Sequence, residues 1–164
     1  MTIAELYKLL TDIPRLSVNS CPEQWTRFNQ RCYHFSSTKS TWEEAKRYCA
    51  LADAQLVVIN DAEEQRFLEK LCHVIRWIGL SDSASEGDWR WVDGTDYRFN
   101  LKFWAAGELH GQRGFEEDCA ALSDDGLWRD WPCSAKHYVI CEKNSNVTFP
   151  LALQRGQSGH CVLL

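Results

Sequence analysis

Residues 103–133 read FWAAGELHGQRGFEEDCAALSDDGLWRDWPC, and the chemistry of the chain is concentrated in this stretch. Seven carboxylates stand here among four glycines: Glu108, Glu116, Glu117, Asp118, Asp124, Asp125 and Asp130, with Gly107, Gly111, Gly114 and Gly126. Like charges this close repel one another unless water or a bound cation separates them. Calcium prefers carboxylate oxygens, so the stretch indicates either a calcium-binding loop or an acidic, solvated loop.

The composition predicts one main domain. The chain has 164 residues, of which 45% are hydrophobic, and no Gly/Ser-rich or Pro-rich linker divides it. A chain of this size can bury a single core. The formal charge of −5 comes with no basic patch, so we do not expect nucleic acid to be a partner.

The eight cysteines include no Cys-x-x-Cys pair of the zinc-ribbon or thioredoxin kind. Disulfides formed in an oxidising compartment explain such a set better than metal or redox chemistry. Residues 1–20 show neither a signal-peptide pattern nor the long apolar run of a membrane span. We therefore expect an extracellular domain whose targeting segment lies outside this chain.

The N-terminal residues have heptad spacing, with Ile3, Leu6, Leu10 and Ile13 three, four and three residues apart before Pro14. This pattern predicts a short helix that ends at the proline. It is either the end of a coiled-coil neck through which the chain oligomerises, or a short amphipathic helix that packs on its own domain or frays.

The middle of the chain alternates helical and strand signals. Residues 21–35 predict a hairpin that turns at Asn29-Gln30. A capping box, Thr41 with Glu44 or Ser40 with Glu43, then starts a helix, and a strand at 55–59 follows it. The face of this helix predicted to be buried carries Trp42, Ala45, Cys49 and Ala52.

A second helix is predicted to begin at Asp61 and to face inward with Phe67, Leu68 and Leu71. From Trp77 onward the helical period gives way to short strand-like runs, which indicates an α+β fold. The connection between Asp96 and Cys119 is long, and long loops in compact domains are usually functional.

Five landmarks in order identify a family resemblance: Trp77-Ile78-Gly79-Leu80, Trp91-Val92-Asp93-Gly94, Glu117-Asp118-Cys119, Trp128-Arg129-Asp130, and Cys133 before Cys141. With these, the chain resembles the C-type lectin-like domain family over about residues 21–143, most of all its asialoglycoprotein-receptor, macrophage galactose-lectin and dendritic-cell lectin branches. The resemblance implies two helices flanking short antiparallel sheets, with a long ligand loop held by disulfides. Residues 1–20 would then be a neck or stalk helix, and 144–164 a C-terminal tail.

The resemblance also implies which cysteines pair: Cys21 with Cys32, Cys49 with Cys141, and Cys119 with Cys133. Cys72 and Cys161 are left over, and they either pair with each other, link to another chain or stay free. Asn146-Val147-Thr148 is a glycosylation sequon in the tail, usable if the chain is secreted.

The family's structural calcium site corresponds to Asp82, Glu86, Glu117 and Asp118, all of which are present. The sugar-linked site departs from the family pattern. Family members carry Glu-Pro-Asn or Gln-Pro-Asp and later Trp-Asn-Asp, whereas this chain has Glu108-Leu109-His110 and Trp128-Arg129-Asp130. The candidate ligand contacts are Glu108, His110, Glu117, Arg129, Asp130 and Trp131.

Two departures argue against direct sugar coordination by a metal. The family's proline follows a cis peptide bond, and with Leu109 a cis bond would cost about 2.5–4 kcal/mol, so we expect a trans peptide with displaced side chains. A divalent cation about 4 Å from the Arg129 guanidinium would be repelled by on the order of 8 kcal/mol at an effective dielectric of 20. We expect Arg129 either to turn into solvent or to replace the cation and pair with Glu108, Glu117 or Asp130. Trp131 either stacks on a ligand or covers the core.

The sequence therefore supports two functions. The first is an extracellular recognition domain of a type II cell-surface receptor, or a secreted one, that binds a glycan or glycoprotein with calcium supporting its long loop. The alternative is a calcium-independent, protein-binding receptor domain of the natural-killer type. An enzyme is not expected, because the five histidines fall in no catalytic pattern and no nucleophile or phosphate-loop motif occurs.

Overall fold

The computed structural model describes residues 1–11, 20–107 and 116–145. Its helices are α1 (Ile3–Thr11), α2 (Trp42–Ala50), α3 (Ala62–Leu71) and the 3₁₀ turn η1 (Tyr97–Phe99). Its strands are β1 (Thr26–Phe28), β2 (Arg31–Phe35), β3 (Gln55–Leu56), β4 (Arg76–Ser81), β5 (Arg90–Trp91), β6 (Cys119–Leu122), β7 (Trp128–Trp131) and β8 (Tyr138–Asn144). Across these described residues, we find no helix with both the length and the apolar character of a bilayer span.

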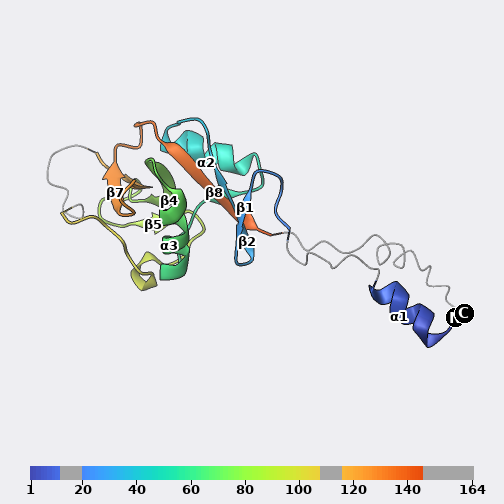
Figure 1. Ribbon diagram of the computed structural model, residues 1–164. Coiled ribbons are helices and arrows are strands. Elements are labelled where there is room, and N and C mark those ends of the chain that lie inside the picture. The colour runs from blue at the N-terminus through green and yellow to red at the C-terminus, as the bar shows by residue number, and fades with distance from the viewer. Residues whose placement is uncertain (12–19, 108–115, 146–164) are drawn as a thin grey trace, which may run out of the picture.

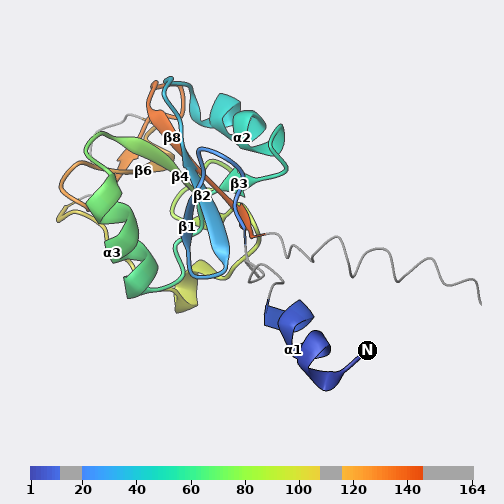
Figure 2. The same ribbon diagram turned by 45° about the vertical axis from the view of Figure 1, so that its right-hand side comes forward.

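The strands form one sheet in the order β1-β2-β8-β4-β6-β7, with β3 added to β8 and β5 added to β4. The α+β class is as predicted, but the sheet is mixed rather than purely antiparallel, because β4 and β8 pair in parallel. The last strand of the chain, β8, lies in the sheet between β2 of the N-terminal hairpin and β4. Figures 1 and 2 show α2 and α3 on opposite sides of β8.

Helix α2 follows its predicted start signal. The Thr41 side chain accepts from the Glu44 backbone N–H, and the Glu44 carboxylate accepts from the Thr41 backbone N–H, which completes a capping box. Trp42, Ala45 and Cys49 are buried against the sheet, as the spacing predicts. The indole N–H of Trp42 donates to the carbonyl of Ile78 at 2.9 Å, so this large side chain is buried with its polar atom satisfied.

Helix α3 begins where predicted but presents a different face to the core. The Asp61 side chain caps it by accepting from the Glu64 N–H at 2.8 Å. Leu68 is fully buried, whereas Leu71 is 41% exposed, so the prediction for Leu71 is wrong. The buried face instead carries Glu64 and Gln65. Gln65 is buried because its side-chain amide bonds to the Gly126 carbonyl and to the Trp128 indole, and apolar periodicity does not reveal such contacts.

The core lies on both sides of the sheet. One cluster fills the space toward α3 and includes Ile78, Leu80, Trp128 and Ile140; the other lies beneath α2. Of the strand predicted at 55–59, only Gln55–Leu56 forms a ladder, while the three residues after it are buried without one. Glycine is required at position 79 of β4, because a Cβ there would lie 2.8 Å from Val92 Cγ2 and 2.9 Å from the Leu56 carbonyl oxygen.

The structure contains the three disulfides that the resemblance implied. Cys21–Cys32 joins the hairpin to the segment before it, Cys49–Cys141 joins α2 to β8, and Cys119–Cys133 joins β6 to the residues after β7. Cys72 at the end of α3 is a buried free thiol, whose pKa burial raises to about 12. Cys161 lies outside the described residues.

The predicted N-terminal helix is present as α1, which Figure 1 draws apart from the domain. Its apolar residues Ile3 and Leu6 are 75% and 47% exposed, so neither packs on the domain here. The assignment of residues 1–20 as a neck stays a prediction. Ile13 and Pro14 fall outside the described residues.

Candidate functional site

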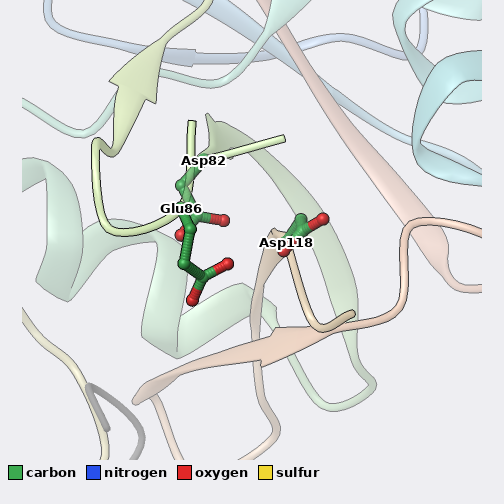
Figure 3. Close-up of side chains that lie close together, drawn as sticks. All are labelled: Asp82, Glu86 and Asp118. Atoms are coloured by element: carbon green, nitrogen blue, oxygen red, sulfur yellow. The ribbon is translucent and has the colours of Figure 1, made fainter. Parts of the chain in front are cut away.

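Three carboxylates from two separate segments meet beside the sheet. Asp82 directly follows β4, Glu86 lies four residues later in the same turn, and Asp118 directly precedes β6. One carboxylate oxygen from each lies within 4.8 Å of the others. Figure 3 shows the three side chains gathered from these two segments.

Backbone hydrogen bonds fix this arrangement. The Asp82 N–H donates to the Asp118 carbonyl at 3.0 Å, which joins the two segments. The turn then closes around the Asp82 side chain, because the Gly87 N–H donates to Asp82 Oδ2 at 2.8 Å and the Ser85 N–H donates to the Asp82 carbonyl at 3.1 Å. Gly87 has φ +76°, a conformation that glycine adopts without strain.

The electrostatics of the cluster are unfavourable without a cation. Asp82 is only 4% exposed, and its Oδ1 is buried without a hydrogen-bond donor among the described residues. Burial raises the pKa of Asp82, and the neighbouring charges of Glu86 and Asp118 raise it further. A buried carboxylate oxygen without a donor is costly, and a bound cation would satisfy it.

The cluster fits calcium by geometry and by ligand type. Calcium binds oxygen at about 2.3–2.6 Å, so two oxygens on one ion lie at most about 5.2 Å apart. The spacing of up to 4.8 Å meets this limit. Three carboxylates supply up to six oxygens when each binds through both, and hard oxygen ligands favour calcium over softer metals.

Glu117 lies outside this cluster, although the family pattern placed it in the same site. Its side chain is exposed, whereas that of Asp118 is half-buried. Glu117 and Asp118 enter β6 in sequence, and successive side chains of an extended segment point to opposite sides. The carboxylate of Asp118 therefore reaches Asp82 while that of Glu117 does not.

The candidate ligand contacts Arg129 and Asp130 lie on strand β7. Arg129 makes a two-point ion pair with Asp125, donating from Nη1 to Oδ1 at 2.8 Å and from Nη2 to Oδ2 at 2.7 Å. These hydrogen bonds lower the pKa of Asp125 to about 2. Asp125 lies in the turn between β6 and β7, and the chain reverses there at Gly126, which has φ +84°, so Asp125 and Arg129 lie next to each other.

Asp125 is a partner that the sequence prediction for Arg129 did not include. The signal was present, because a carboxylate four residues before an arginine, with a glycine between them, suits a tight reversal.

Of the remaining candidate residues, the structure describes Asp130 and Trp131. Asp130 is half-buried on β7, paired in register with Ala120. Trp131 packs its ring against His137, with centroids 4.5 Å apart, and joins the core beneath α2, which is the core-covering alternative. Glu108, Leu109, His110 and Asn146 lie outside the described residues.

Comparisons with known proteins agree with the fold and the landmarks. The family model described as "Lectin C-type domain" matches residues 38–143. Human asialoglycoprotein receptor 2 is 43% identical over 137 residues, which are 80% of this chain and 43% of the receptor. The chain thus spans less than half the length of that relative.

Two solved structures are similar over most of the domain. The cow CD23 carbohydrate-recognition domain, solved in the presence of a GlcNAc2Man3 oligosaccharide, aligns with a TM-score of 0.73 and 32% identity, covering 78% of this chain and 98% of that one. A calcium-independent type II antifreeze protein aligns with a TM-score of 0.71 and 31% identity, covering 78% and 97%. The order of landmarks, the three disulfides, the mixed sheet and these matches lead to one conclusion: this chain belongs to the C-type lectin domain family.

Proposed function

We propose that this domain recognises a glycan or glycoprotein, and that calcium held by Asp82, Glu86 and Asp118 supports its ligand loop. The observation that carries the proposal is the buried Asp82 Oδ1, which has no donor among the described residues and lies beside two further carboxylates. The likeness to a domain solved in the presence of an oligosaccharide supports the glycan part. The similar antifreeze protein is calcium-independent, so the argument for calcium rests on the cluster itself and not on the fold.

The residues of the cluster suggest how a cation would act. Bound calcium would supply positive charge that offsets the repulsion among the three carboxylates. Asp82 and Glu86 belong to the turn after β4, whereas Asp118 ends the segment that enters β6. Joining them would fix the position of residues 116–118, which adjoin the long loop.

The ligand-contact set is proposed on family position. It comprises Glu108, His110, Glu117, Arg129 and Asp130. We do not include direct coordination of a sugar by a metal at this set, because the guanidinium of Arg129 repels a divalent cation. In recognition, sugar hydroxyls would instead donate hydrogen bonds to the carboxylates and accept them from the guanidinium. Trp131 is left out because its ring is packed against His137.

We place the domain at residues 21–143 on an extracellular or cell-surface protein, with 1–20 as a neck and 144–164 as a tail. The exposed apolar residues Ile3 and Leu6 of α1 favour pairing of this helix with copies of itself. The disulfides favour an oxidising compartment.

The second candidate function is calcium-independent binding of a protein ligand. Its specific support is Arg129, which presents a guanidinium where the family's sugar sites carry a neutral side chain. In this case the acidic cluster would remain without a metal and the loop would contact a protein surface.

A glycan array probed with the full chain, in millimolar calcium and in chelator, tests the proposal. Glu86→Gln removes one cluster charge, and Glu43→Gln makes the same change on the exposed face of α2. We expect glycan binding in calcium that falls in chelator and in Glu86→Gln but not in Glu43→Gln. Binding to no glycan, or binding equal in calcium and chelator, would contradict the calcium-supported function and favour the second candidate.

A further inference from the structure

A cleft opens beside the acidic cluster, lined by residues from the segment between β4 and η1. Its volume is about 830 Å³, and its lining includes Glu86, Asp88, Arg90, Asp96, Tyr97 and Arg98. Small-molecule sites usually measure about 300–1,000 Å³. Glu86 belongs to both the cluster and the cleft, so the two sites are contiguous.

Two carboxylate–guanidinium pairs form the polar rim of this cleft. Arg90 donates to Asp88 Oδ2 from Nε at 3.0 Å and from Nη2 at 2.6 Å. Arg98 donates to Asp96 from Nε to Oδ1 at 3.0 Å and from Nη2 to Oδ2 at 2.7 Å. The hydrogen bonds and the charge of Asp96 raise the pKa of Arg98, with a smaller contribution from the charge of Asp88.

These pairs do little for folding, since all four side chains are exposed and such ion pairs contribute little to stability. They do fix hydrogen-bonding groups at the mouth of the cleft. Both hydrogen bonds from Arg90 end on Oδ2 of Asp88, which leaves Oδ1 as an acceptor among the described residues. The guanidinium Nη1 groups remain as donors.

Aromatic side chains provide the apolar wall. Tyr97 is half-buried, and its hydroxyl accepts from the Trp104 indole N–H at 2.8 Å, which holds the ring in place. Trp89 lines the same cleft and packs on Trp104 with ring centroids 4.7 Å apart. A rigid aromatic wall beside fixed donors and acceptors suits a ligand with an apolar face and several hydroxyls.

The charge balance favours a neutral ligand. The lining carries the negative charges of Glu86, Asp88 and Asp96 against the positive charges of Arg90 and Arg98. The balance is one negative charge. The cleft therefore has no excess positive charge to attract an anion, and each guanidinium already has its carboxylate.

We propose that this cleft is a second, metal-independent saccharide subsite that binds a neutral hexose unit. The proposal rests on the proposed function in taking a glycan as the ligand, and it adds a contact surface that needs no calcium.

The test is a nuclear magnetic resonance titration of the ¹⁵N-labelled full chain in chelator, with the neutral disaccharides lactose, cellobiose and maltose. We expect the backbone amides of residues 86–98 to shift on addition of at least one of them. Sialyllactose has the lactose core with an added carboxylate, so it should bind this cleft about threefold or more weakly than lactose. Absence of shifts in 86–98 with all three neutral sugars would overturn the proposal, and so would tighter binding of sialyllactose.

A matched pair of double variants separates the subsite from general effects. Asp88→Ala/Arg90→Ala removes one rim pair without changing the net charge, and Glu43→Ala/Lys46→Ala removes an exposed pair on α2 in the same way. We expect the first to weaken binding about tenfold and the second by less than about twofold. Equal effects of the two variants would overturn the proposal, provided that both keep the wild-type melting temperature in chelator.

The outcome is separable from that of the calcium proposal. Chelator-resistant shifts in 86–98 support the subsite even if calcium changes neither stability nor array binding. Conversely, calcium-dependent array binding without shifts in 86–98 would remove the subsite alone.

Discussion

The backbone N–H of Asp82 donates to the backbone carbonyl of Asp118 at 3.0 Å, and this contact joins the two halves of the acidic cluster without using a carboxylate. The carboxylates are thus brought together by the sheet, not by attraction between them. Their mutual repulsion is a cost that the folded chain carries unless a cation is bound.

Asp82→Asn should therefore have opposite effects on stability in chelator and in millimolar calcium. In chelator it removes a buried charge and raises the melting temperature, because the amide oxygen of the substituted side chain can still accept from the Gly87 N–H. In millimolar calcium the wild type should gain roughly 0.4–1.4 kcal/mol, if its affinity is that of extracellular sites, and the variant should lose this gain. Melting curves test both signs, and Asp124→Asn is the exposed control.

The result would go against the cluster as a metal site if calcium and chelator gave the same melting curve for the wild type. An Asp82→Asn variant that kept the full calcium gain would count against it equally.

Gln65 should be a strong stability determinant although it is polar. Its Oε1 accepts from the buried Trp128 indole N–H at 3.0 Å, and its Nε2 donates to the Gly126 carbonyl at 2.6 Å. Gln65→Ala leaves both buried groups without a partner and opens a cavity, so we expect a loss of about 2–4 kcal/mol in the free energy of unfolding. Urea denaturation measures it. The control is Glu63→Ala, which removes an exposed side chain from the outer face of the same helix.

Glu64 should make the apo protein lose stability as pH rises. Burial, followed by the nearby charge of Glu142, raises the pKa of Glu64 from 4.5 to about 8. The folded chain then holds more protons than the unfolded chain between about pH 4.5 and 8, so the free energy of unfolding falls across this window. Glu64→Gln should match the wild type near pH 5 and exceed it by about 1–3 kcal/mol near pH 9.

This comparison is made by urea denaturation in chelator across the pH range. A variant whose stability ran parallel to that of the wild type from pH 5 to 9 would show that Glu64 titrates normally.

Removing the Cys119–Cys133 disulfide should destabilise the region of the ligand loop. The two cysteines are 14 positions apart, and loop-closure entropy for a loop of this size gives about 3 kcal/mol. Cys119→Ser/Cys133→Ser should lower the free energy of unfolding by about this amount and weaken the calcium-induced rise in melting temperature, because Asp118 directly precedes Cys119. An unchanged calcium response would mean that the sheet alone holds Asp118 in place.

Simple monosaccharides should not bind by direct metal coordination. Arg129 stands at a sequence position where the family carries a neutral ligand, and its guanidinium is held in a two-point ion pair with Asp125. Calorimetric titration of mannose and galactose in calcium should show no chelator-sensitive binding for the wild type. Arg129→Asn removes the repulsion and should bind calcium more tightly than the wild type does, whereas the exposed Arg47→Asn should not. Millimolar or tighter monosaccharide binding by the wild type, abolished by chelator, would refute the expectation.

The sequence by itself determined the elements whose signals are local. Thr41 with Glu44 and Asp61 with Glu64 are three residues apart, so the two helix starts need only nearby atoms. The hairpin turn at Asn29 is local in the same sense, with φ +53° at that residue. The order of the landmarks, compared with a known family, also supplied the disulfide pairs and the candidate metal ligands.

Only the tertiary structure decided which of those ligands meet. Asp82 and Asp118 are far apart in the chain and are brought together by the pairing of β4 with β6, while Glu117 next to Asp118 stays outside the cluster. The partner of Arg129 was set by a turn, and the inward face of α3 by the hydrogen bonds of Gln65. For the acidic cluster and for Gln65, contacts between segments far apart in the chain outweigh the local pattern: strand pairing brings Asp82 to Asp118, and the buried amide of Gln65 finds its partners at Gly126 and Trp128.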